Sequence, residues 1–91
     1  MDAALESLVN ELRVKIIATL NLIDVTPEDI VPEAPLVGGD LGIDSIDILE
    51  LVMMIEKDYA VKVDSKEMGE KVFASLKAMA AHIREQSPQL A

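Results

Sequence analysis

Residues 38–50 read GGDLGIDSIDILE, a glycine-rich loop that runs into an apolar segment. Asp44 and Ser45 are both residue types that favour helix N-caps, and the acidic Asp47 is an ordinary first-turn residue. A helix is therefore predicted to begin at Asp44 or Ser45 and to end near Tyr59. Taken alone, this pattern indicates an ordinary helix cap, so any function of Ser45 depends on its surroundings.

A long amphipathic helix is predicted before this stretch, from Leu5 to about Ile23. Its apolar residues fall on one stripe when successive residues are turned by ~100°. The stripe consists of Leu5, Leu8, Val9, Leu12, Ile16, Leu20 and Ile23. Val14 and Ile17 lie off the stripe, so both are expected to be scattered surface residues.

The connection between these two helices is predicted to be a long loop. Thr26-Pro27-Glu28-Asp29 indicates a short helical turn with Thr as N-cap and Pro at the first position, and the later prolines end it. The loop, from Pro32 to Asp44, is expected to contact the core through Leu36, Leu41 and Ile43. Its glycines, which allow positive φ, are Gly38, Gly39 and Gly42.

Two more helices are predicted towards the end of the chain. Asp64-Ser65-Lys66-Glu67 is a capping-box pattern for a short helix that Gly69 and the residues after it are not expected to extend far, and a last helix starts near Ser75 and ends before Pro88. One face of the last helix carries Leu76, Met79, Ala80 and Ile83. The only candidate strand, residues 61–63, is too short and has no partner.

The predicted fold class is therefore all-α. We expect one domain, residues 1–91, with a frayed tail from about residue 87. The architecture is a small antiparallel helical bundle of three main helices, with a short helix before the last and a long loop between the first and second.

The composition restricts the possible functions. The 91 residues include no Cys, which excludes disulfides, zinc-thiolate sites and a cysteine nucleophile. The 8 basic and 17 acidic side chains give a net charge of −9, which argues against binding nucleic acid or anionic lipid. The charge either predicts partners with basic patches or only keeps a small protein soluble. Without a signal-like start or a long apolar run, the chain is expected to be a soluble cytoplasmic monomer that does not insert stably into membranes.

The second predicted helix has more apolar surface than a small bundle can bury. Its core face is predicted to hold Ile48, Leu51, Val52, Ile55 and Tyr59. The opposite stripe holds Ile46, Leu49 and Met53, and an acidic fringe is formed by Asp44, Asp47, Glu50 and Glu56. Either the long loop folds back over this stripe, or the stripe is a docking surface for a partner with an apolar floor and a basic rim.

Ser45 lacks the surroundings of a catalytic serine. The nucleophile-elbow pattern G-x-S-x-G is missing, and the only His, His82, is expected to be a solvated residue of the last helix. Asp40, Asp44 and Asp47 do not follow the EF-hand spacing, so no metal site is predicted. A hydroxyl that is modified by another enzyme fits better, because a phosphate ester at a helix N-terminus would meet free N–H groups and the helix dipole.

The motif around Ser45 is similar to a known family signature. Residues 41–47, LGIDSID, followed by residues 49–53, LELVM, resemble the signature of acyl carrier proteins. The similarity extends to the first helix, the Thr-Pro-Glu-Asp turn, residues 57–59 at the end of the second helix, residues 63–64 before the short helix and Phe73 before the last. Nearly the whole chain is covered by this resemblance.

The resemblance implies a carrier and not an enzyme. In the family, a Mg²⁺-dependent phosphopantetheinyl transferase moves 4′-phosphopantetheine from coenzyme A onto the serine, here Ser45, and the thiol of the arm holds acyl groups as thioesters. Asp44 would help to position the metal during transfer. The resemblance also implies that the helical core shelters the acyl chain. The surface read by synthases, reductases and acyltransferases would be Ile46, Asp47, Leu49, Glu50, Met53 and Glu56.

Several residues depart from housekeeping fatty-acid carriers. Ile43 stands where Ala is common, Ile48 replaces a commonly polar residue, and the Gly38-Gly39 pair alters the loop. These departures favour a stand-alone bacterial carrier, and they leave open primary fatty-acid synthesis, a specialised acid or a polyketide-like product. The alternative function is an unmodified acidic interaction module that docks through the same helix.

Overall fold

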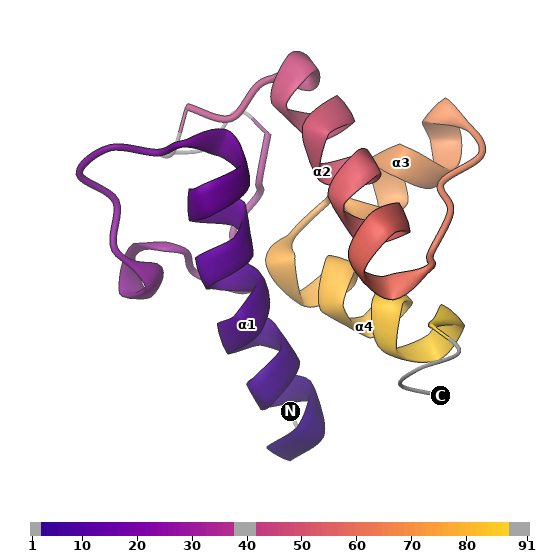
Figure 1. Ribbon diagram of the computed structural model, residues 1–91, viewed down its shortest axis with the longest axis horizontal. Coiled ribbons are helices and arrows are strands. Elements are labelled where there is room, and N and C mark those ends of the chain that lie inside the picture. The colour runs from indigo at the N-terminus through magenta and orange to yellow at the C-terminus, as the bar shows by residue number, and fades with distance from the viewer. Residues whose placement is uncertain (1–2, 38–41, 88–91) are drawn as a thin grey trace.

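The computed structural model describes residues 3–37 and 42–87. The elements are α1 (Ala3–Leu20), the 3-10 turn η1 (Pro27–Asp29), α2 (Ser45–Tyr59), α3 (Lys66–Val72) and α4 (Leu76–Gln86), shown in Figure 1. Between the described residues the only β-type pairings are two isolated bridges. The predicted small all-α bundle, with its short third helix and long first connection, is confirmed.

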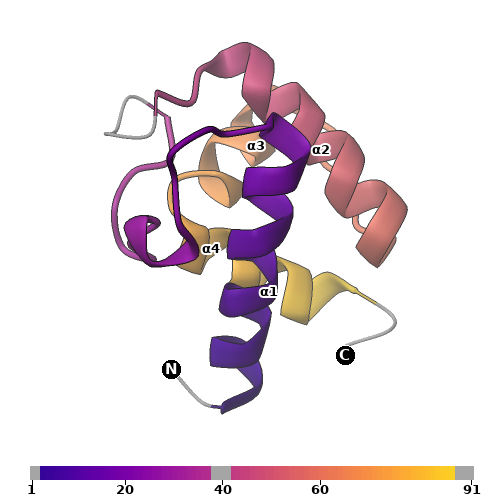
Figure 2. The same ribbon diagram turned by 60° about the vertical axis from the view of Figure 1, so that its left-hand side comes forward.

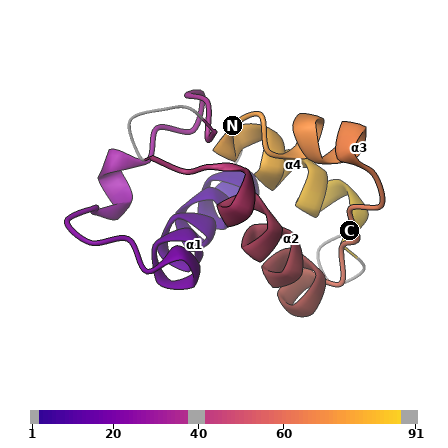
Figure 3. The ribbon, with the colours of Figure 1, turned by 90° about the horizontal axis from the view of Figure 1, so that it is seen from above.

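The helices are arranged around α1. This helix packs against both α2 and α4, and α3 packs against α4. The long connection with η1 lies on one side of α1, and α3 lies beyond α2 and α4 on the other (Figures 1 and 3). No helix in the described part of the chain is long and apolar enough to cross a membrane.

The core is mainly aliphatic, with Tyr59 and Phe73 as its aromatic residues, and is filled from every helix. Burying these side chains removes apolar surface from water, which is the main favourable term in folding. The predicted stripes of α1 and α4 are confirmed at Leu8, Val9, Leu12, Ile16, Leu76, Met79, Ala80 and Ile83, which are all buried. From α2 the fully buried positions are Leu51 and Ile55, with Met54 and Tyr59 nearly so.

The prediction for the end of α1 is wrong at two residues. Asn21 adopts a left-handed conformation, φ 52°, and the Leu22 N–H donates to the Ile17 carbonyl at 3.0 Å, which is a common way for a helix to end. The chain therefore leaves the helix before Ile23, whose side chain is 78% exposed instead of buried. Ile17, predicted at the surface, packs partly buried against the core.

The long connection is held against the bundle at several points. Figure 2 shows it leaving the end of α1, passing η1 and returning to the start of α2. The Lys77 N–H at the start of α4 donates to the Pro32 carbonyl at 2.9 Å, and Arg13 Nε on α1 donates to the Ile30 carbonyl at 3.1 Å. Leu36 and Ile43 are buried, as predicted. The predictions for Gly38, Gly39 and Leu41 lie outside the described residues.

The predicted helix starts are confirmed by their caps. The Asp29 carboxylate of η1 accepts from the Thr26 N–H at 2.9 Å, and the hydroxyls of Ser65 and Ser75 each accept a backbone N–H at 3.1 Å at the starts of α3 and α4. After α4, Ser87 is buried and its hydroxyl donates to the Tyr59 carbonyl at 2.7 Å. The tail was predicted to fray from about residue 87, but Ser87 itself is held by this bond, and residues 88–91 lie outside the described residues.

Candidate functional site

Ser45 is the first residue of α2 and is exposed. Asp44 precedes it as the N-cap, and its Oδ1 accepts the N–H groups of Ile46 and Asp47, both at 3.0 Å. Asp47 Oδ2 accepts the Asp44 N–H in return at 3.2 Å. This reciprocal capping box fixes the backbone on both sides of Ser45.

The capping box corrects one expectation about the helix start. A phosphate on Ser45 was expected to meet free N–H groups, but those of Ile46 and Asp47 already donate to the Asp44 carboxylate. The helix dipole still favours a negative group at this end, whereas the carboxylates of Asp44 and Asp47 oppose one. A cation that screens these carboxylates would favour placing a phosphate there.

Gly42 supplies the turn that leads into this helix start. Its φ is 71°, a conformation that residues with a Cβ rarely adopt, and no atom of the described residues lies within 4 Å of where a Cβ would be. The structure thus bears out the expected positive φ at Gly42. The open space beside the backbone leaves room for another molecule to approach Ser45.

The outward stripe of α2 is exposed. Ile46 is 71% exposed, Leu49 64% and Met53 68%. The described residues of the long loop leave this stripe uncovered, which argues against the alternative that the loop folds back over it. The neighbouring carboxylates of Asp44, Glu50 and Glu56 are exposed as well, and that of Asp47 is half-buried by its capping role.

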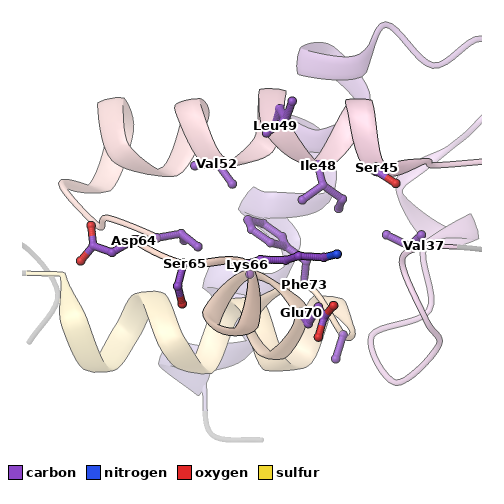
Figure 4. Close-up of a pocket in the computed structure, with 13 residues that line it drawn as sticks. Val37, Ser45, Ile48, Leu49, Val52, Asp64, Ser65, Lys66, Glu70 and Phe73 are labelled. Atoms are coloured by element: carbon purple, nitrogen blue, oxygen red, sulfur yellow. The ribbon is translucent and has the colours of Figure 1, made fainter.

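A groove of about 730 Å³ runs between α2 and α3. Figure 4 shows Ser45 and Val37 at one end of it and Asp64 towards the other. The α2 wall is formed by Ser45, Ile48, Leu49 and Val52, and the α3 side by Lys66, Gly69, Glu70 and Phe73. Because the walls are largely apolar and the serine stands at one end, a chain attached to Ser45 could lie along the groove.

Sequence reasoning had no direct signal for this groove. It depends on the distance between α2 and α3, which periodicity does not encode, and Val63 of the intervening segment also lines it. Gly69 was expected to end the short helix, but α3 continues through it to Val72. This glycine is the one residue that could have pointed to the groove, because glycine weakens helices and leaves space.

The predicted position of His82 needs correction. It lies on α4 and is half-buried instead of solvated, and its Nε2 is buried without a hydrogen-bond partner in the described residues. It is not among the residues that line the groove beside Ser45. The described part of the chain also contains no cluster of three His, Cys, Asp or Glu side chains that could hold a metal.

Fold and site together define a small helical domain that displays a serine at a helix start, beside an apolar groove and an acidic helix. A family profile described as a phosphopantetheine attachment site matches residues 11–83. An acyl carrier protein of Desulforapulum autotrophicum is 43% identical over 54 residues, which are 59% of this chain and 69% of that protein.

Two further relatives are similar over comparable lengths. The acyl carrier protein AcpXL of Mesorhizobium japonicum is 40% identical over 58 residues, 64% of this chain and 59% of that protein. An acyl carrier protein of Nitratidesulfovibrio vulgaris is 40% identical over 45 residues, 50% of this chain and 58% of that protein. The chain thus spans 58–69% of the length of these relatives. No solved structure matches it significantly.

The chain belongs to the acyl carrier protein family. Its prosthetic group is 4′-phosphopantetheine, and it is a carrier and not an enzyme. The resemblance seen in the sequence is confirmed by these comparisons, and the unmodified docking module is not favoured by them.

Proposed function

We propose that Ser45 is the attachment residue and that the chain carries acyl intermediates as thioesters on the arm. The observation that supports this most is the position of Ser45, exposed at the first residue of α2 and at one end of the apolar groove. When bound, phosphopantetheine supplies the thiol that the cysteine-free chain lacks. The chain's own residues fix the serine, display it and offer an apolar surface beside it.

Asp44 is proposed to assist the transfer of phosphopantetheine to Ser45, here called loading, in addition to capping α2. Its Oδ1 already accepts two backbone N–H groups, which hold the carboxylate next to Ser45. A carboxylate oxygen is a good ligand for Mg²⁺, the ion that the family's transferases require. Asp44 would therefore help to place the metal while the phosphodiester to the serine forms.

The groove between α2 and α3 is proposed to shelter the acyl chain. Ile48, Val52 and Phe73 give it aliphatic and aromatic walls, and an apolar chain that leaves water for such walls gains about 0.8 kcal/mol per buried methylene. The sequence prediction placed this shelter in the core between parted helices. The groove offers a place for the acyl chain without any separation of the helices.

The partners are proposed to be a phosphopantetheinyl transferase and acyl synthases, reductases and acyltransferases with basic docking patches. The exposed stripe of Ile46, Leu49 and Met53 would supply apolar contact, and the acids around it would steer the encounter. Among those acids, Asp47, Glu50 and Glu56 lie along α2. The monomeric state and the cytoplasmic location stay predictions.

Mass spectrometry of the intact protein tests the attachment residue. Incubation with coenzyme A, Mg²⁺ and a broad-specificity transferase should add one phosphopantetheine to the protein and none to Ser45→Ala. Asp44→Asn keeps a side-chain oxygen for the cap but loses the charge, so it should load more slowly while its circular dichroism stays unchanged. If no phosphopantetheine were added to the protein with the wild-type sequence, the docking module would be favoured instead.

A further inference from the structure

Gly69 stands in the middle of α3, a helix of only 7 residues. Its N–H donates to the Ser65 carbonyl at 3.0 Å, and its carbonyl accepts from the Phe73 N–H at 2.9 Å, so its backbone is part of the helix. A glycine at such a position weakens a helix relative to alanine, and short helices are marginal to begin with. Gly69 therefore destabilises α3.

The fold itself does not require a glycine there. Its backbone does not have the positive φ that Gly42 has. Among the described residues, a Cβ built on Gly69 would meet only Cγ1 of Val63, at 3.6 Å, which is an ordinary van der Waals contact. An alanine would thus fit without strain and would strengthen the helix.

Gly69 does have a consequence for the groove, because it is one of the residues that line it. At this point the α3 wall is bare backbone, between the side chain of Lys66 one turn before it and those of Glu70, the next residue, and Phe73, one turn after it. The nearest side chain, Val63, lines the same groove. The missing side chain therefore adds width to the groove and not to the core.

We propose that Gly69 is a specificity-determining residue that keeps the groove wide enough for acyl chains bearing a methyl branch or a ring. A protein cavity of about 150 Å³ is enough to hold benzene, and the groove has about 730 Å³. A branch methyl on the chain and an alanine methyl at position 69 would compete for the same space. The inference rests on the proposed function, since the acyl chain reaches the groove from Ser45.

The test compares straight and methyl-branched acyl groups with the same number of carbons, each attached through the arm on Ser45. For each, the melting temperature of the acylated protein is compared with that of the protein carrying the free thiol. In the protein with the wild-type sequence, both acyl groups should raise the melting temperature by similar amounts. In Gly69→Ala the straight chain should keep its increment, and the branched chain should lose half of its increment or more.

Two further variants control for helix stability and for volume. Without an acyl group, Gly69→Ala should melt about 2–8 °C higher, because alanine is the better helix former. Lys71→Ala, an exposed position of α3 that does not line the groove, should change neither increment. Adding Val63→Ala to Gly69→Ala removes the side chain nearest to the new methyl, so the increment of the branched chain should recover.

The outcomes separate this inference from the proposed function. Equal increments for both chains in Gly69→Ala would overturn the specificity role, as would a lower melting temperature of that variant before acylation. If Ser45 is loaded but neither chain raises the melting temperature, the groove does not hold the acyl group and the inference falls, while the carrier function stands. If Ser45 cannot be loaded at all, the proposed function itself fails.

Discussion

The two faces of α2 contrast sharply in burial although they belong to one 15-residue helix. The inward face is closed, with Leu51 and Ile55 at 0% exposure and Tyr59 at 5%. The outward face is open at Ile46, Leu49 and Met53. The difference shows that one helix serves two purposes: its inward side chains hold the fold, and its outward side chains are free to contact other molecules.

Polar contacts reinforce the inward face at the C-terminal end of α2. Tyr59 Oη donates to Glu11 Oε2 of α1 at 2.9 Å, and Lys15 Nζ of α1 forms an ion pair with Asp58 Oδ2 at 2.9 Å. The Lys15 ammonium also lies 5.4 Å from the centre of the Tyr59 ring, within the range of a cation–π contact. These contacts lie at the opposite end of α2 from Ser45, so the helix is fastened to α1 away from the proposed attachment point.

The largest effect on stability is expected from Leu51, and the matched comparison is Leu49, two residues away on the opposite face of α2. Leu51→Ala should lower the free energy of unfolding by about 2–5 kcal/mol, because it leaves a cavity in a closed core. Leu49→Ala should change it by no more than about 0.5 kcal/mol, because its side chain is already largely in water. Urea denaturation followed by circular dichroism measures both.

The order of the two variants should be reversed for partner binding, where Leu49→Ala should have the larger effect. Leu49→Ala is expected to weaken loading by the transferase, because it removes one of the exposed apolar contacts. Similar losses of stability in the two variants would show that the outward stripe is covered in solution, and the contrast between the faces would not hold.

A smaller effect is expected from the hydrogen bond between α1 and α2. Tyr59→Phe removes the hydroxyl and keeps the ring, so it should lower the free energy of unfolding by about 0.5–1.5 kcal/mol. Glu50→Gln, which changes an exposed acid on the same helix, is the matched control and should leave stability nearly unchanged. If Tyr59→Phe left the free energy of unfolding unchanged, apolar packing alone would account for the closed inward face.

The same tyrosine predicts a loss of stability in alkaline solution. Burial raises the pKa of the Tyr59 hydroxyl above its usual range, and the hydrogen bond to Glu11 and the charges of Glu11 and Asp58 raise it further. The folded state thus holds a proton that the unfolded chain releases above about pH 10, so stability is complete below that pH and falls as the pH rises beyond it.

Tyr59 is the only tyrosine, so tyrosinate absorbance reports it directly. The absorbance should rise together with unfolding, and the alkaline fall in stability should be less steep in Tyr59→Phe. Ionisation near pH 10 with the fold retained would contradict this expectation.

The smallest effect on stability is expected from the acids of the outward face. Glu50→Lys should leave the free energy of unfolding within about 0.5 kcal/mol but lower the rate of loading by the transferase roughly threefold to tenfold, because steering by charge is reversed there. Added salt should shrink this difference, since charges are screened over about 8–10 Å. Stopped-flow loading assays measure both.

Two controls make this result specific to the outward face. Glu85→Lys changes the same charge on α4, at an exposed position, and should affect loading less. Asp47→Lys should also slow loading, but it removes the carboxylate that accepts the Asp44 N–H, so it should cost stability as well. Equal rates for Glu50→Lys and Glu85→Lys would limit the role of the outward face to its apolar stripe.

Much of the fold could be predicted from short sequence signals. Asp44, Ser65 and Ser75 marked helix starts because their side-chain oxygens bond to backbone N–H groups only a few residues away. The exposed stripe of α2 was predictable for a related reason: its spacing follows the helical repeat, which is also a local property.

Features that depend on distant parts of the chain could not be predicted in the same way. Ile23 was predicted on the buried stripe, but the left-handed Asn21 turns the chain away before it. Ile30 is buried because it meets α1 across the long connection, where Arg13 binds its carbonyl. The groove likewise arises from how α2 and α3 are placed, and the sequence signals only its Gly69.

The capping box at the start of α2 also determines how a group on Ser45 can move. Asp44 and Asp47 hold the backbone on both sides of the serine through three hydrogen bonds. The arm would therefore swing from a fixed hinge, and its reach would come from rotation about its own single bonds. The protein fixes the position and orientation of the attachment point, which lies between the groove on one side and the acidic outward face on the other.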